Sequence, residues 1–210
     1  MHHPVVVGAA LAFTAISLGV PSANAASKDA LAEANYKQVA LFSLANIKPK
    51  TPVDALAAIE AAHDGSGTTF KVAALSGKPC RTAKRKSTCL RAWDLALSTT
   101  PTTEWKDDFH LQQPVKGRFL VATRGDHVFA PPTDASFFGT INSAVEAAWL
   151  LRTTAIRSVP PTFVGFYSRN VSDCPITREI RAVEVQRNGT TREIARANSD
   201  ANSDQPQPCI

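Results

Sequence analysis

A dense group of basic side chains between and beside two cysteines is the part of this sequence best suited to bind a ligand. A disulfide between Cys80 and Cys89 would place them on a small rigid loop, which lowers the entropic cost of binding an anionic group. We therefore predict that this loop contacts a phosphate, a sulfate or an anionic glycan. The alternative is a solvated surface loop. The six side chains fall within 14 positions that contain no Asp or Glu: Lys78, Arg81, Lys84, Arg85, Lys86 and Arg91.

Two acid and histidine pairs form a second candidate site. Asp108 and His110 precede one predicted strand, and Asp126 and His127 follow its far end. If adjoining strands brought the two pairs together, they would suit a hydrolase. The alternative is a set of surface and turn residues, because neighbouring side chains in a chain point in different directions. The sequence holds no H-E-x-x-H or G-x-S-x-G pattern that would favour the enzyme.

A group of carboxylates just before this region offers a variant of the enzyme hypothesis. Glu104, Asp107 and Asp108 would supply the paired carboxylates of a glycoside hydrolase, and Trp105 would stack on a sugar. Such pairs are common in any chain, so the alternative is an amphipathic loop around a core tryptophan.

Four cysteines allow three disulfide pairings. Loop-closure entropy favours the nearer partners, Cys80 with Cys89, which leaves Cys174 with Cys209. The second bridge would hold a polar, proline-containing tail, residues 198–210, that lacks the apolar residues to fold by itself. Because no C-x-x-C pair occurs, we predict neither a metal site nor a cofactor.

The first 25 residues have the pattern of a cleaved secretory signal peptide. Residues 5–20 are almost all apolar, and residues 21–26 supply the small side chains that a signal peptidase recognises. The apolar run is shorter than the roughly 20 residues of a membrane span. An uncleaved anchor or a misassigned start is the alternative, because no Lys or Arg precedes the apolar run. We expect a secreted or periplasmic protein with no transmembrane segment after cleavage, in agreement with paired cysteines.

The charge of the chain favours an anionic partner. The formal net charge is +5 and the isoelectric point is about 9.2. An anionic glycan, a phosphate-bearing envelope polymer or a protein would suit this charge. Nucleic acid is not expected, because only Trp93 lies near the basic group to stack on bases. The sequence favours a binding or accessory protein of unknown specificity, with an extracytoplasmic hydrolase or an inhibitor-type protein as alternatives.

Hydrophobic periodicity predicts a single α+β domain over residues 26–197, opened by a helical hairpin. The two helices are expected at 27–47 and 51–64, the second with Thr51 as its N-cap. Strands are then expected at 69–75, 90–98, 115–123 and 127–130. The segment 90–98 also suits an amphipathic helix, but alternation around Trp93 favours a strand.

The second half of the chain carries clearer local signals. Ser143 and Glu146 have capping-box spacing and predict one inserted helix over 143–156. A strand at 162–168 follows. Asn188-Gly189 predicts a type I′ turn between strands 179–187 and 190–197. The predicted fold class is therefore α+β with a mainly antiparallel sheet.

Overall fold

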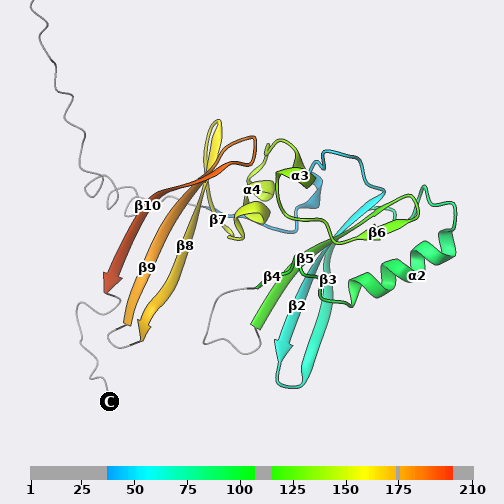
Figure 1. Cartoon of the computed structure of the whole chain (residues 1–210), viewed down its shortest axis with the longest axis horizontal. Helices are drawn as coiled ribbons and strands as arrows, with labels where there is room; N and C mark the ends of the chain where they lie inside the picture. The colour runs from blue at the N-terminus through cyan, green and yellow to red at the C-terminus, as the bar shows by residue number, and fades with distance from the viewer. Residues whose placement is uncertain (1–36, 107–114, 174–175, 201–210) are drawn as a thin grey trace, which may run out of the picture.

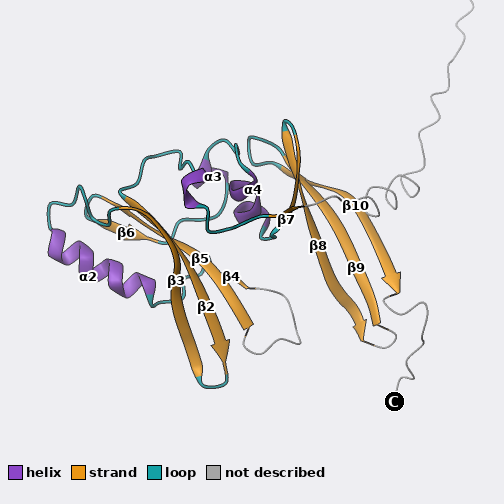
Figure 2. Cartoon of the chain, turned by 180° about the vertical axis from the view of Figure 1, so that it is seen from behind, coloured by secondary structure: helices purple, strands orange, loops and turns teal. Residues whose placement is uncertain are grey.

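Two antiparallel β-sheets dominate the fold in a computed structural model, which describes residues 37–106, 115–173 and 176–200 (Figure 1). The first, sheet A, has the strand order β1-β7-β8-β9-β10, and the second, sheet B, has the order β3-β2-β5-β4 with β6 also paired to β5. Short helices α3 and α4 lie between the sheets, and α2 lies on the opposite side of sheet B (Figures 1 and 2).

Apart from β1, which comes first and joins sheet A, the strands of sheet B precede those of sheet A along the chain. Sheet B is formed by β2 (Ala55–Asp64), β3 (Gly67–Gly77), β4 (Trp105–Lys106), β5 (Val115–Arg124) and β6 (His127–Phe129). Sheet A is formed by β1 (Lys37–Gln38), β7 (Ala155–Val159), β8 (Thr162–Asp173), β9 (Ile176–Val185) and β10 (Thr191–Asp200). The helices are the 3₁₀-helix η1 (Leu44–Asn46), α2 (Lys86–Leu97), α3 (Ala135–Phe138) and α4 (Ala144–Leu151).

The main hydrophobic core fills the space between the two sheets. Leu56 and Leu120 enter it from sheet B, Ile156 and Val185 from sheet A, and Trp149 from α4, and none of these five side chains is more than 3% exposed. A second cluster lies under α2, where Trp93 packs against apolar residues of β2 and β5. The central strands β2 and β5 of sheet B are therefore covered on both faces.

The predicted α+β fold class is wrong, because two antiparallel sheets with only short helices form the described residues, and the predicted N-terminal helical hairpin is wrong with it. Residues 37–38 form β1, η1 is a single turn, and residues 55–64 form β2. The alanine-rich segment of β2 looks helical because both of its faces are buried, so it lacks the polar alternation of a half-exposed strand. Ala57 and Ile59 face the cluster under α2, while Leu56 and Ala58 face the main core. Residues 27–36 of the first predicted helix lie outside the described residues.

The strand predicted at 90–98 is also wrong, because this segment belongs to α2. Cys89 and Trp93, four residues apart, are the buried side chains of the helix. Leu95, which completed the apparent alternation, is 67% exposed. Burial of two side chains four residues apart is the pattern of a helix, and it does not fit the two-residue alternation of a strand.

Several local predictions are confirmed. The capping box is present: the N–H of Glu146 donates to Ser143 Oγ, and the Glu146 carboxylate accepts the N–H of Ser143. The helix ends at Leu151, earlier than predicted, with Arg152 in the left-handed conformation. The predicted strands at 69–75, 115–123 and 162–168 lie within β3, β5 and β8.

The predicted C-terminal hairpin forms between β9 and β10 with a different turn. The N–H of Gln186 donates to the carbonyl of Thr190, and the N–H of Gly189 donates back to the carbonyl of Gln186. Only Gly189 in this loop has a positive φ, +84°, whereas a type I′ turn needs two such residues. The connection is a three-residue loop closed by a left-handed glycine. No helix in the described ranges is long and apolar enough to cross a membrane.

Candidate functional site

A disulfide joins Cys80 to Cys89, as the sequence predicts. It closes the connection between β3 and α2, and its Cα atoms lie 5.9 Å apart across a sequence separation of 9. Both cysteines are buried, at 0% and 2% exposure. The connection is therefore fixed at its start and at the first turn of the helix. Cys174 and Cys209, the other predicted pair, lie outside the described residues.

The buried carboxylate of Asp54 holds the middle of this loop. Its Oδ2 accepts the Thr82 hydroxyl at 2.6 Å, the Thr82 N–H at 3.3 Å and the Gly125 N–H at 3.0 Å. The hydroxyl of Thr82, assisted by these N–H groups and by the charge of Arg81, lowers the pKa of Asp54 against the opposing effect of burial. Asp54 thus joins the loop to the start of β2 and to the β5–β6 turn.

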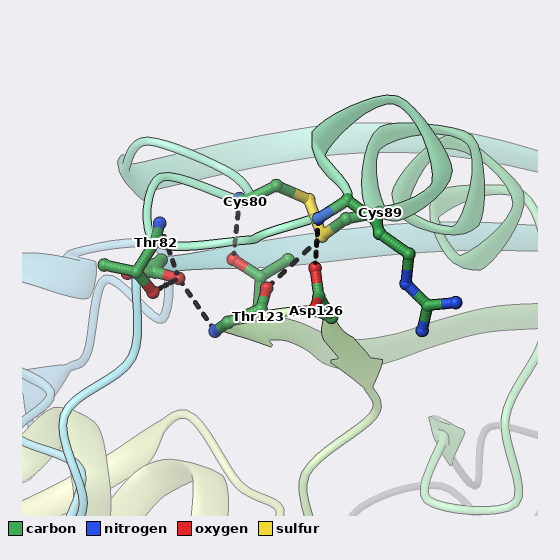
Figure 3. The surroundings of a disulfide bond; sticks show 8 residues. Cys80, Thr82, Cys89, Thr123 and Asp126 are labelled. Carbon is green, nitrogen blue, oxygen red and sulfur yellow. Dashed lines mark hydrogen bonds between the residues drawn. A yellow bond between two sulfur atoms is a disulfide. The ribbon is translucent and has the colours of Figure 1, made fainter.

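Two further side chains of sheet B fix the ends of the loop. Thr123, fully buried in β5, accepts the N–H of Cys80 at 3.2 Å. Asp126, in the β5–β6 turn, accepts the N–H of Arg85 at 2.8 Å where α2 begins (Figure 3). Together with the disulfide, these contacts preorganise the backbone from which the basic side chains project.

All six predicted basic side chains are exposed on this fixed backbone. Arg81 lies 3.8 Å from Asp54, and it is the only one of the six that approaches a carboxylate to ion-pair distance within the described parts of the chain. Lys84, Arg85 and Lys86 lie at the N-terminus of α2, where the helix dipole is also positive and the first turn has no acidic residue. The surface there favours an anion.

The predicted acid and histidine cluster is only half described. Asp126 uses its carboxylate to bind the Arg85 N–H, and His127 is exposed at the start of β6. Asp108 and His110 lie outside the described residues. Their meeting with Asp126 and His127 stays a prediction.

Glu104 and Trp105 of the glycosidase hypothesis are both buried, and its other carboxylates, Asp107 and Asp108, lie outside the described residues. The Glu104 side chain is 3% exposed and lies 2.6 Å from His63 Nε2. Trp105 packs edge-to-face on Trp149 at 6.2 Å, and the Arg118 guanidinium lies over its ring at 5.1 Å. Trp105 therefore serves the core, which is the alternative that the sequence left open.

His63 and Glu104 form a contact that the sequence did not suggest. Nδ1 of His63 lies 3.0 Å from the Thr68 hydroxyl, so the imidazole joins β3 on one side to the residue before β4 on the other. Gly117 of β5 makes room for this pair, because a Cβ there would lie 1.8 Å from Glu104 Oε1. Gly117 lies inside the strand predicted at 115–123, and a glycine within a strand indicates that another group approaches the backbone closely there. This was the sequence signal for the pair.

Comparison with known proteins gives no match, whether against protein-family models, curated proteins or solved structures. The function must therefore be argued from the residues of this chain.

Proposed function

We propose that this is a secreted or periplasmic binding or accessory protein whose disulfide-closed loop contacts an anionic partner. The observation that carries the proposal is the set of six exposed cations on a backbone held by a disulfide and by Asp54, Thr123 and Asp126. The disulfide that closes the loop is also compatible with an extracellular environment.

Preorganisation is the physical reason for preferring binding to a merely solvated loop. A flexible loop would lose conformational freedom when it bound, whereas this loop is already ordered by the fold. The dipole of α2 adds to the field of Lys84, Arg85 and Lys86, while the single carboxylate of Asp126 accepts the N–H of Arg85 at the same end of the helix. The partner we propose carries closely spaced anionic groups, such as the phosphates of an envelope polymer or the charged groups of a glycan.

The test is retention of the purified protein on the envelope fraction of its host across a salt series. Raising salt from about 0.01 M to about 1 M shortens the Debye length from about 30 Å to about 3 Å, so contacts between exposed charges should be lost. We expect retention of the unaltered protein at low salt and release at high salt. A loop variant with Arg81, Lys84, Arg85 and Lys86 changed to Glu should not be retained at any salt concentration.

A charge-matched variant separates the loop from the overall charge. Changing four exposed cations elsewhere, Lys48, Lys50, Lys116 and Arg152, to Glu gives the same net charge with the loop intact. This variant should still be retained. Equal retention of the loop variant and the unaltered protein would refute the proposal, and so would equal loss in both variants. If only the loop variant loses retention and salt has no effect on the unaltered protein, the partner would be a protein and not a charged polymer. Circular dichroism checks that each variant is folded.

A further inference from the structure

A hydroxyl, an imidazole and a carboxylate lie in series where the β2–β3 hairpin meets the residue before β4. Nδ1 of His63 lies 3.0 Å from Thr68 Oγ1, and Nε2 lies 2.6 Å from Glu104 Oε1. His63 and Thr68 pair directly across the two strands, so their side chains share one face of sheet B. A nucleophile within hydrogen-bond reach of a base, which a third group orients, is the arrangement of nucleophilic catalysis.

The hydrogen bonds determine which nitrogen of His63 carries the proton. An ionised carboxylate only accepts hydrogen bonds, so Nε2 donates to Glu104. In the neutral imidazole the other nitrogen then has a lone pair, and Nδ1 accepts the hydroxyl proton of Thr68. This is the tautomer in which His63 can act as a general base on that hydroxyl.

Burial separates the group that orients the imidazole from the groups that would react. The Glu104 side chain is 3% exposed, whereas the His63 side chain is 20% exposed and Thr68 is exposed. A Cβ added at Gly67, next to Thr68, would meet nothing within 4 Å, so the surface on that side is open. A substrate can therefore reach the hydroxyl while the carboxylate stays shielded from water.

The surroundings of Thr68 suit an acyl group with a small apolar part. Phe70 lies two positions along β3 on the same face, and it is only partly buried, so it offers an apolar contact. Because β2 is the only strand paired with β3 among the described residues, every second N–H of β3 points away from β2 to the open edge. One such N–H belongs to Thr68 or to its neighbour Thr69, and it can donate to a carbonyl oxygen.

We propose that Thr68, His63 and Glu104 form a catalytic triad that transfers the acyl group of a small carboxylic ester to Thr68 and then to water. Thr68 Oγ1 forms a bond to the acyl carbon, and the bond from that carbon to the alcohol oxygen breaks. The hydroxyl proton passes to His63 Nδ1 and from there to the departing alcohol. Water then attacks the acyl-threonine and gives a proton to Nδ1, which returns it to the Thr68 oxygen. Glu104 is a positioning residue, which holds the imidazole and stabilises its positive charge.

The test is hydrolysis of p-nitrophenyl acetate by the purified protein, together with mass spectrometry of the acylated chain. We expect an initial burst of nitrophenolate and one acetyl group on the peptide that contains Thr68. Thr68→Val should abolish both, because it removes the hydroxyl and keeps the shape of the side chain. Thr191→Val, which changes an exposed threonine of edge strand β10, is the matched control and should alter neither. An acetyl group on His63 or on a lysine, and none on Thr68, would overturn the proposal.

Rate measurements then separate the triad from the ordinary reactivity of an imidazole. His63→Gln should lower the rate of acyl transfer by about 100-fold or more, which is the contribution of a positioned general base. Glu104→Gln should lower kcat and leave KM unchanged, because the carboxylate contacts His63 and not the ester. Free imidazole at the same concentration is the control. A protein no faster than free imidazole, or a His63→Gln variant as active as the parent, would overturn the triad. Unfolding curves show whether each variant is folded.

Discussion

Glu146 gives the sharpest test of how this fold is held together. The residue is fully buried in the first turn of α4. Its Oε1 accepts the N–H of Lys48 at 2.7 Å, and its Oε2 accepts those of Asn142 at 2.7 Å and Ser143 at 3.1 Å. One carboxylate thus caps α4 and also joins it to the segment that follows η1, 98 positions earlier.

The change Glu146→Gln keeps the shape of the side chain but replaces one acceptor oxygen by an NH₂ group. If the amide carbonyl stays on Asn142 and Ser143, the NH₂ faces the Lys48 N–H and that donor is left buried without an acceptor. A hydrogen bond to a charged group contributes about 1.5–3 kcal/mol, and the two remaining bonds also lose their charge assistance. We expect a loss of about 2–4 kcal/mol in the free energy of unfolding, or roughly 5–15 °C in Tm for a chain of this size.

Denaturant unfolding at neutral pH, with the disulfide intact, measures this loss. The midpoint should fall while the m-value stays the same, since the surface exposed on unfolding does not change. Asp94→Asn, which alters an exposed carboxylate of α2, is the control and should stay within about 0.5 kcal/mol of the parent. A Glu146→Gln protein as stable as this control would refute the account of the carboxylate as the link between α4 and the η1 segment.

Two further predictions concern the residues around the loop and the histidine. Gly117→Ala should lower stability by about 1–3 kcal/mol in thermal unfolding, because its methyl group would overlap the buried Glu104 carboxylate. Gly65→Ala, with open space around it, is the control. An equal loss of stability in both variants would contradict this reasoning. Since the pKa of Asp54 is lowered from 3.8, its contribution is fully present above that pH and is lost as the pH falls through the lower folded-state pKa. Asp54→Asn should therefore flatten the fall in unfolding free energy below about pH 4, and an unchanged slope would contradict the role given to this carboxylate.

The parts of the fold that could be predicted are those determined by neighbouring residues. The capping box at Ser143 depends on one residue three positions later, and the C-terminal hairpin on a glycine between two β-rich segments. The disulfide from Cys80 to Cys89 followed from a short separation. In each case the free energy that selects the structure comes from contacts within about ten positions along the chain.

The errors occurred where tertiary burial decides between a helix and a strand. Strand β2 lies between β3 and β5 with both faces covered, so alanine is favoured for its size and not for its helix propensity. In α2, Leu95 lies two positions after Trp93 and so gave the alternating pattern of a strand. Leu95 is exposed, however, and only Cys89 and Trp93 of the helix are buried. Hydrophobicity alone does not reveal which of these apolar residues will be covered by another layer.

The same distinction applies to the candidate site. The exposed cations could be found in the sequence because they are close together along the chain, but the groups that fix them come from other strands. Asp54 lies 28 positions before Thr82, and Thr123 lies 43 positions after Cys80. A run of Lys and Arg by itself indicates only a solvated surface. The buried carboxylate of Asp54 and the buried hydroxyl of Thr123 order the loop that carries these cations. Because an ordered loop loses less conformational freedom on binding, these contacts favour the proposal that the loop binds a partner.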